Sequence, residues 1–509
     1  MMSRKYAGRI TMLILLVVLT AVSALHSRQA RASAWRAQVD PWVLETARLD
    51  EETEFILFLT EQADLSPAAD LHAKNDKGSF VFQALTEVAD RTQPPLIETL
   101  KSLEVEYRSY WVANMIWVRG DISVVEAMAR RPDISHIYAN PSVRLEELII
   151  EESYVEGVAS VELNIVQVNA DDVWALGYTG QGAVIGGQDT GYDWDHPALK
   201  NQYRGWDGND ANHNYNWHDS IHSGGGTCGA DSAEPCDDQQ HGTHTMGTMV
   251  GDDGGSNQIG MAPGARWIGC RNMDQGNGTP TTYAECYQWF IAPTDLNNEN
   301  PDPSKAPHAI NNSWSCPTSE GCTDPNVLLT VVDAVRAAGI LTAHSAGNLS
   351  SAGCSSIDAP SAIYDSSFTV AAVSSTDAIA SFSRRGPITV DGSGRLKPDI
   401  SAPGVGIRSS IPGGGYASGW SGTSMAAPHV AGEAALMISV SPTLAGQVDE
   451  IESIMNQTAV QLTSSQICGG VPGDQIPNNT FGYGRIDALA AANYIIPDYY
   501  NWFPYLVTQ

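Results

Sequence analysis

Basic side chains are scarce in this sequence. It holds 28 Lys and Arg residues against 58 Asp and Glu residues, which gives a formal net charge of −30. Nucleic acids and anionic membranes bind basic surfaces, so this balance argues against either as the main partner. A strongly negative surface keeps a soluble protein from aggregating, but it does not define a fold.

Cysteine is absent before residue 228, and no two cysteines have the C-x-x-C spacing. The missing spacing argues against a structural zinc site. An even number of cysteines in an exported chain indicates disulfides rather than buried thiols. The loops 228–236 and 316–322 are short enough to be closed by disulfides, although loop length alone does not fix the pairing. The eight cysteines stand at positions 228, 236, 270, 286, 316, 322, 354 and 468.

Long apolar runs are also absent, except at the N-terminus. Residues 10–25 follow a basic segment, and small residues at 22–24 and 30–32 offer two cleavage sites. This run is shorter than the roughly 20 residues of a spanning helix, so we predict a cleaved signal peptide at 1–24, with an uncleaved anchor as the alternative. We therefore expect a secreted, extracellular protein without stable membrane insertion after signal cleavage.

Residues 50–145 have the pattern of a small α+β domain. The β-α-β-β-α-β order of its predicted elements is that of a ferredoxin-like fold. Pro141 and the acidic residues Glu146, Glu147, Glu151 and Glu152 then indicate an exposed linker. The predicted strands are 55–59, 105–110, 113–118 and 134–138, and helical periodicity occurs at 77–103 and 124–130.

The pattern changes near residue 160 to short apolar strands that alternate with amphipathic helices. Such alternation predicts a three-layer α/β domain, in which helices cover both faces of a parallel sheet. Active sites collect at the edge where such strands end. Residues 200–240, rich in Gly, Asn, Asp and Cys, are predicted to form a long insertion loop. The predicted strands are 183–187, 267–273, 309–314, 340–346 and 368–373, and the predicted helices are 243–250, 282–291, 326–338, 424–439 and 448–456.

Three segments supply an acid, a base and a nucleophile. Asp189 follows an apolar strand, whereas His241 and Ser424 each open a helix. A serine hydroxyl attacks well only when a base such as histidine takes its proton, and a buried aspartate fixes the tautomer of that histidine. Backbone N–H groups at a helix start suit an oxyanion, and Asn348, after the strand 340–346, offers a second donor. Together with the segment of Asn348, the four segments are Gln188-Asp189-Thr190-Gly191, His241-Gly242-Thr243-His244, Ser345-Ala346-Gly347-Asn348 and Ser421-Gly422-Thr423-Ser424-Met425-Ala426-Ala427-Pro428-His429-Val430-Ala431-Gly432.

The order of these segments and their residues resemble the motifs of the subtilisin-like serine protease family, the subtilases, and the resemblance covers residues 165–492. The resemblance implies a parallel-sheet, three-layer α/β peptidase domain. In it, Asp189 orients His241, which acts as general base and acid, and Ser424 becomes acylated. Asn348 and the Ser424 backbone are then the oxyanion hole.

The same resemblance implies two strands that hold an extended substrate between them. These are Gly276-Asn277-Gly278 and Ser313-Trp314-Ser315. Asp358, just before Pro360, falls near the floor of the primary specificity pocket. A carboxylate there favours Lys or Arg in the substrate, whereas an outward-facing Asp358 leaves a pocket for large apolar side chains. Both specificities stay open at this point.

The resemblance also implies a zymogen. We expect a signal peptide at 1–24, a propeptide at 25–150 that acts as chaperone and inhibitor, a peptidase domain at 151–492 and a short tail at 493–509. The alternative for the second segment is an unrelated small domain. Self-cleavage is expected to release the mature enzyme, whose partners are protein or peptide substrates and its own propeptide.

No cofactor is required for this chemistry. Many subtilases hold a structural calcium ion with an acidic residue shortly after a His-Pro pair. Here His196-Pro197 is followed by Ala198 and Leu199, so the resemblance does not carry that site over. Asp252 and Asp253 remain as candidate ligands for a cation.

Three other functions match part of the pattern. An inactive, binding-only relative would share the fold, but the catalytic set is complete. An esterase of the α/β-hydrolase type carries G-x-S-x-G, whereas position 426 here is Ala, and its acid follows the serine. A metallohydrolase would need His213, His218 and His222 as ligands, but they lie in a Gly- and Asn-rich loop that we expect to be solvated.

Overall fold

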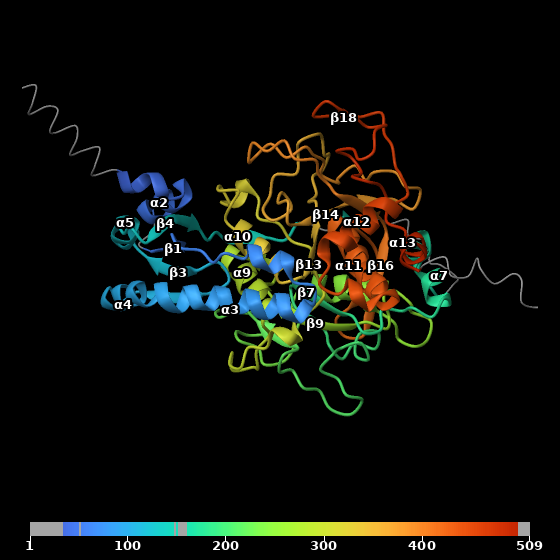
Figure 1. The fold of residues 1–509 in the computed structure, drawn as a ribbon, viewed down its shortest axis with the longest axis horizontal. Coiled ribbons are helices and arrows are strands. Elements are labelled where there is room, and N and C mark those ends of the chain that lie inside the picture. The colour runs from blue at the N-terminus through green and yellow to red at the C-terminus, as the bar shows by residue number, and fades with distance from the viewer. Residues whose placement is uncertain (1–33, 50–51, 147–148, 151–159, 497–509) are drawn as a thin grey trace, which may run out of the picture.

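The computed structural model describes residues 34–49, 52–146, 149–150 and 160–496. The predicted signal peptide, the segment 151–159 and most of the predicted tail lie outside the described residues. Figure 1 shows two units packed side by side, residues 34–146 in blue to cyan and residues 160–496 in green to red. No helix within the described residues is long and apolar enough to cross a membrane.

The smaller unit is a four-stranded antiparallel sheet in the order β2-β3-β1-β4, with helices on both faces. Side chains alternate along β1, so Phe55 and Leu57 pack under α2, α4 and α5, whereas Ile56 packs with α3 and the larger unit. Pro94 begins α4 and divides the predicted helix 77–103 into two. The elements are α2 Pro41–Leu49, β1 Thr53–Leu59, α3 Lys74–Thr92, α4 Pro94–Ser102, β2 Glu106–Tyr110, β3 Met115–Gly120, α5 Ile122–Ala129 and β4 Ile134–Ala139.

The larger unit is built on a seven-stranded, wholly parallel sheet in the order β15-β14-β13-β12-β7-β9-β8. β7 is the first strand of this sheet along the chain. β8 and β9 lie on one side of it and β12 to β15 on the other, so the strand order reverses between β7 and β12. Ligands of open parallel sheets bind beyond the strand ends at such a reversal. The strands are β7 Val184–Asp189, β8 Trp217–Asp219, β9 Arg266–Arg271, β12 Ala309–Asn312, β13 Leu341–Ser345, β14 Phe368–Val373 and β15 Ile400–Pro403.

Helices cover both faces of this sheet, which confirms the predicted three-layer α/β fold. One core contains side chains of α8, α11, α12 and α13 against the sheet, and the other contains those of α9 and α10. The smaller unit packs against the helix layer of α9 and α10, where α3 contacts α10 and β2 contacts α9. The helices are α6 Leu163–Gln167, α7 Ala170–Ala175, α8 His241–Val250, α9 Pro280–Ile291, α10 Leu329–Ala337, α11 Thr423–Val440, α12 Val448–Thr458 and α13 Ala488–Ile495.

Two short segments near the end of the smaller unit pair with strands of the larger one. The first, β5 (Val143–Arg144), adds to the hairpin of β10 (Met273–Asp274) and β11 (Asn277–Gly278). The second, β6 (Ile149–Ile150), adds to the hairpin of β16 (Ile407–Ile411) and β17 (Gly415–Ser421). The chain between the two units is therefore held at both places as an added strand.

This pairing changes the interpretation of the predicted linker. Pro141 and Val143 are buried, and Glu146 is partly buried, so this part is not the exposed linker that the acidic run predicts. Its other acidic residues, at 147, 151 and 152, lie outside the described residues.

The eight cysteines form four disulfides, and none is free. The two pairs that short loops favour, Cys228–Cys236 and Cys316–Cys322, are among them. The other two, Cys270–Cys286 and Cys354–Cys468, join residues farther apart in the sequence.

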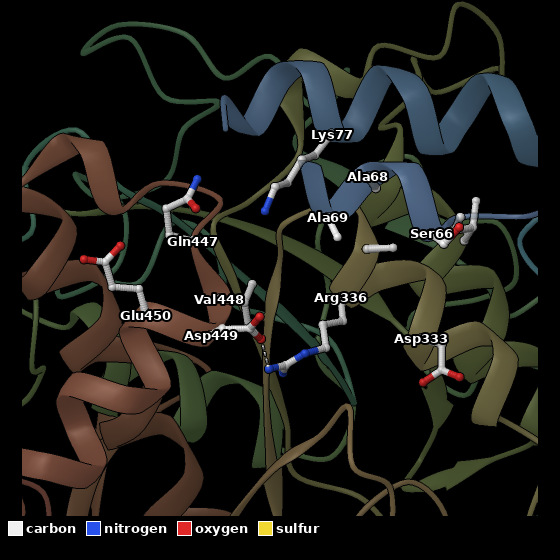
Figure 2. A pocket seen from close by; sticks show the side chains of 12 residues that line it. Ser66, Ala68, Ala69, Lys77, Asp333, Arg336, Gln447, Val448, Asp449 and Glu450 are labelled. Atoms are coloured by element: carbon white, nitrogen blue, oxygen red, sulfur yellow. Dashed lines mark hydrogen bonds and ion pairs between the residues drawn. The ribbon is translucent and has the colours of Figure 1, made fainter. Parts of the chain in front are cut away.

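A cavity of about 390 Å³ lies where the two units meet, away from the strand ends. Figure 2 shows Lys77 reaching into it from α3, opposite Arg336 and Asp449 of the larger unit. The Lys77 ammonium donates to the carbonyl of Gly446 at 2.9 Å, and Arg336 forms two 2.7 Å bonds with Glu452. Both cations are therefore bonded to neighbouring residues of the larger unit, and the cavity is part of the joint between the units.

Candidate active site

The structure brings Asp189 and His241 together at the strand reversal. Asp189 is the last residue of β7 and His241 is the first of α8, and both side chains are 1% exposed. His241 Nδ1 lies 2.7 Å from Asp189 Oδ1, which also accepts the Thr190 N–H at 2.8 Å. Asp189 Oδ2 accepts from Thr245 Oγ1 at 3.3 Å. These contacts fix the carboxylate and direct Nε2 of the ring away from it.

Ser424 stands in the first turn of α11, a helix that packs against α8. Its hydroxyl donates to the Ser313 carbonyl at 3.3 Å, and the Ser313 hydroxyl donates to the Ser424 carbonyl at 2.9 Å. His241 Nε2 is buried and has no hydrogen-bond partner among the described residues. Nε2 of His241 is therefore without a partner in the described part of the chain, and the Ser424 hydroxyl bonds to Ser313 rather than to this nitrogen.

Asn348 follows β13, and its amide orientation is fixed by α11. Its Oδ1 accepts the N–H of Thr423 at 2.9 Å and the Thr423 hydroxyl at 3.0 Å. Because the amide oxygen is held in this way, the Nδ2 donor points elsewhere, and a side chain added at Gly422 would lie 3.4 Å from it. The donor thus faces the residues that precede Ser424.

The two predicted substrate strands lie at the same edge, and one is already paired. Gly278 pairs with Val143 and Asn277 with Arg144 in an antiparallel ladder, and the Leu145 N–H donates to the Gly276 carbonyl at 2.7 Å. On the other strand, Ser315 Oγ lies 3.5 Å from Glu146 Oε1. Trp314, between Ser313 and Ser315, stacks on Tyr283 with ring centroids 3.9 Å apart.

Comparison with known proteins identifies the family. The Subtilase family (Peptidase_S8) matches residues 180–484, which contain Asp189, His241, Asn348 and Ser424. The chain belongs to the subtilases.

Curated relatives agree with this assignment. Bacillopeptidase F of Bacillus subtilis (strain 168) is 36% identical over 474 residues, which cover 87% of this chain and 31% of that protein. Subtilisin E of the same organism is 31% identical over 334 residues, 65% of this chain and 74% of that protein. The thermostable alkaline protease of Halalkalibacterium halodurans is 29% identical over 397 residues, 77% of this chain and 93% of that protein. The chain therefore spans about a third of the length of bacillopeptidase F.

The cysteine-rich insertion and the stretch Phe481-Gly482-Tyr483-Gly484-Arg485 predict a likeness to bacillopeptidase F, and the comparison confirms it. In this subtilase the stretch lies against β15, where the Gly484 carbonyl accepts from the Ser401 N–H. It thus supports the sheet and does not reach the strand ends.

Asp358 does not offer a free carboxylate in this structure, because it forms an ion pair with Arg384. The guanidinium is 9% exposed and the carboxylate is 44% exposed. The preference for Lys or Arg, which an unpaired Asp358 would support, stays untested. The charge nearer to Asn348 is that of Arg384, whose side-chain Nε donates to the Asn348 carbonyl at 3.5 Å and whose backbone N–H donates to the Gly347 carbonyl at 3.1 Å.

Two ionisable groups at this edge have displaced pKa values. Burial holds the pKa of His244 well below its usual range, and the charge of His241 acts in the same direction. The ring of His244 stacks on Trp420 with centroids 4.2 Å apart. Burial also raises the pKa of Glu146, while Arg384 and the Asn348 N–H act in the opposite direction.

The three loop histidines do not form a metal site. His213 and His218 are buried, so the prediction of a solvated loop is wrong for this part, which also contains β8. Tyr203 Oη lies 2.9 Å from His213, whereas His218 and His222 lie 3.0 and 2.9 Å from Glu285. Burial would lower the pKa of His222, but Glu285 raises it to about 9. Burial would raise the pKa of Glu285, but the two histidines lower it to about 2.

No group of three or more metal-ligating side chains is present in the part of the chain that the structure describes. Asp252 and Asp253 are engaged with their own loop, because they accept the N–H groups of Gly254 and Gly255 at 2.8 Å. A calcium site on these residues stays a prediction.

Sequence reasoning missed Glu146 and Arg384 as members of the site. Glu146 belongs to an acidic run, and Arg384 stands in a loop without a motif. The contact between them spans more than two hundred residues, so local patterns could not have found it. If the pairing of residues 143–145 with Gly276-Asn277-Gly278 had been known in advance, it would have placed Glu146 beside Ser315 and Asn348.

Proposed function

We propose that this subtilase is a serine endopeptidase, exported as a precursor, that removes its own N-terminal segment. The observation that carries the proposal is the buried Asp189–His241 pair, which leaves Nε2 to accept a proton. Asp189, His241 and Ser424 are the catalytic residues in this proposal. The charge on Asp189 stabilises the imidazolium that forms when the proton arrives.

The reaction starts when the Ser424 hydroxyl turns from Ser313 to His241 Nε2 and loses its proton to it. The serine oxygen attacks the substrate carbonyl and forms a tetrahedral oxyanion. His241 then gives its proton to the departing amine as the C–N bond breaks. Water repeats the sequence on the acyl-enzyme and releases the acid product. This chemistry needs no cofactor.

The oxyanion is stabilised by two donors in this proposal. One is Asn348 Nδ2, whose direction follows from the bonds between Thr423 and Oδ1. The other is a backbone N–H at the start of α11, because the first N–H groups of a helix have no partner within it. Both donors are fixed before substrate binds, so little reorganisation accompanies the reaction.

Residues 34–146 act as a propeptide in this proposal. The support is the antiparallel pairing of β5 with β11, because a strand in this position excludes a substrate strand. The unit also docks through polar contacts outside the site, such as Tyr110 Oη to Glu285 at 2.9 Å and the Trp111 N–H to Gln288 at 2.6 Å. Export through the signal at 1–24 agrees with the four disulfides, which persist in oxidising compartments.

Labelling with a fluorophosphonate, with and without a chelator, tests the proposed chemistry. We expect wild-type protein to be labelled in both conditions, because the nucleophile is a serine and no metal takes part. Ser424→Ala is expected to abolish labelling, to lower turnover by about 10⁶-fold and to leave the precursor uncut.

Ser453→Ala is a matched control, since Ser453 lies on an exposed position of α12. It is expected to label and mature as the wild type does. Labelling that a chelator abolishes would support a metallohydrolase. A Ser424→Ala precursor that still matures in a protease-free preparation would show that self-cleavage is wrong.

A further inference from the structure

The carboxylate of Glu146 is held by three donors at the active-site edge. Its Oε2 accepts the Asn348 N–H at 2.7 Å, and Ser315 Oγ lies 3.5 Å from Oε1. Arg384 Nη2 lies 3.8 Å from Oε1. The Glu146 side chain is 22% exposed, so its acid group is inside the protein surface. A hydrogen bond or ion pair to a charged carboxylate is stronger than the same contact to a neutral group.

Strand pairing places Glu146 immediately before the reacting centre. Val143 and Arg144 pair with β11, and the Leu145 N–H donates to Gly276. On the far side, Ile149 pairs with Ser421, three residues before Ser424. The two ladders therefore place Glu146 and Ile149 at the edge that carries Ser424.

The contact with Asn348 identifies which residue offers its carbonyl. Asn348 supplies the proposed oxyanion donor through its side chain and binds the Glu146 carboxylate through its own backbone N–H. Because both groups belong to Asn348, this contact places Glu146 beside the residue that carries the proposed oxyanion donor. The bond that follows Glu146 is therefore the candidate for cleavage.

Arg384 is built into the pocket as a fixed cation. Its Nη1 donates to the Ser356 carbonyl at 2.9 Å and also contacts Asp358, which leaves Nη2 to face Glu146. The Asp358 side chain is more exposed than that of Arg384, so water screens its charge more. The guanidinium is therefore the charge that a substrate side chain meets.

Gly347 makes room for this arrangement. Its φ is 92°, and a Cβ there would lie 2.7 Å from Arg384 Cδ and 3.4 Å from Glu146 Oε1. A larger residue would separate the guanidinium from the carboxylate.

We propose that the primary pocket selects an acidic residue, so that this subtilase cleaves after Glu, including the bond after Glu146 that separates propeptide from enzyme. Arg384 is the specificity-determining residue, and Asp358 is a positioning residue that holds its guanidinium. The inference rests on the proposed endopeptidase function. It makes Glu, instead of Lys or Arg, the preferred substrate residue.

Four peptides that differ only in the residue before the scissile bond, Glu, Gln, Lys or Phe, test the specificity. Glu and Gln have the same shape, so their ratio isolates the charge. We expect kcat/KM for Glu to exceed that for Gln by about tenfold or more, and Lys to be the poorest. A higher kcat/KM for Phe or Lys than for Glu would overturn the proposal. Hydrolysis of none of the peptides would instead count against the endopeptidase function.

Arg384→Gln tests the residue assignment. We expect the Glu to Gln ratio to fall to about one while cleavage after Phe continues. Arg385→Gln is the matched control, because Arg385 contacts Ala352 and Gln466 and not Glu146. Asp358→Asn is expected to lower the Glu to Gln ratio in part, a change that a merely structural role would not produce. An unchanged ratio in Arg384→Gln would remove Arg384 from the pocket.

Maturation gives a measurement that needs no peptide. N-terminal sequencing of the active form is expected to start at residue 147, and Glu146→Lys is expected to slow conversion of the purified precursor by tenfold or more. A mature chain that starts elsewhere, with Glu146→Lys converting at the wild-type rate, would overturn the assignment of the cleaved bond.

Discussion

At the scale of single residues, Asn348 is held from both sides. Its amide oxygen bonds to Thr423 and its backbone N–H bonds to the carboxylate of Glu146. One residue thus couples the proposed oxyanion hole to the specificity pocket. Substitution of the Asn348 side chain removes the contact with Thr423 and the proposed oxyanion donor, but it keeps the contact with Glu146, because the backbone N–H remains.

Asn348→Ala is therefore expected to lower kcat by roughly 10²–10³ while the Glu to Gln preference is kept. Steady-state kinetics on the Glu and Gln peptides measure both quantities. Near-full turnover in the variant would remove Asn348 from the oxyanion hole. A large fall in the Glu to Gln ratio would instead show that the substitution has disturbed the pocket.

Glu433 is an acid that is completely buried in α11, with neither carboxyl oxygen hydrogen-bonded to another described residue. Burial raises its pKa from 4.5 to about 8, and the charge of Asp487 adds to the effect. Because the folded pKa is the higher one, the associated stability is fully present below about pH 4.5 and is lost as pH rises through about 8.

Glu433→Gln removes this titration. We expect the variant and the parent to unfold at similar urea concentrations at pH 5, and the variant to be more stable by a few kcal/mol at pH 9. Both are made in the Ser424→Ala background to prevent autolysis. Glu450→Gln, at an exposed position of α12, is the control and is expected to show no such difference. Equal stabilities of Glu433→Gln and its parent at pH 9 would contradict the buried, neutral acid.

At the scale of elements, the disulfides differ in the length of chain that they close. Cys354–Cys468 spans 114 residues and ties the loop of Ser356, which holds Arg384, to the C-terminal part of the domain. Cys228–Cys236 spans only 8. A longer closed loop restricts the unfolded chain more.

Replacing Cys354 and Cys468 by Ala is therefore expected to lower the free energy of unfolding by about 3–5 kcal/mol. The same change at Cys228 and Cys236 is expected to lower it by about 2–3 kcal/mol. Urea unfolding in the Ser424→Ala background measures both. The reverse order of the two losses would show that local contacts, not loop length, dominate.

Element prediction from the sequence succeeded for most strands of the central sheet and for the main helices that cover it, and it missed other strands, among them β8, β15 and the seven-residue β17. The strand 368–373 coincides with β14, and the helix 424–439 lies within α11. β8 was missed because three residues in a Gly- and Asn-rich loop carry no periodicity. β15 was missed because it has four residues and ends at Pro403.

The residues of the candidate site fall into two groups, those that the sequence could identify and those that it could not. Asp189, His241, Asn348 and Ser424 each stand at the end of an element and within a recognisable segment, so the sequence could identify them. Glu146 acquires its place only when the N-terminal unit docks, and Arg384 is held by Ser356 and Asp358 of another loop, which are tertiary effects that no local pattern encodes.

At the scale of the whole molecule, the joint between the two units contains a buried amine. Lys74 of α3 is 8% exposed and donates to the carbonyl of Ala306 at 2.9 Å. Burial lowers its pKa to about 7, and the charge of Arg204 adds to the effect. Burial and the charge of Lys74 in turn lower the pKa of the neighbouring His308 to about 3, so that ring stays neutral near pH 7.

Docking of the N-terminal unit is therefore expected to depend on pH. Because the pKa of Lys74 is lower in the docked state than its ordinary value of 10.5, its contribution to docking is fully present above about pH 10.5 and is lost as pH falls through about 7.

Lys74→Met removes this charge and is expected to strengthen docking at pH 6 by a few kcal/mol. Hydrogen exchange of β1 to β4 in the uncut Ser424→Ala protein reports docking at each pH. Lys77→Met is the control on the same helix, since Lys77 is only partly buried and in Figure 2 reaches into a cavity. Equal pH dependence in Lys74→Met and the parent would show that the joint does not sense pH through this amine.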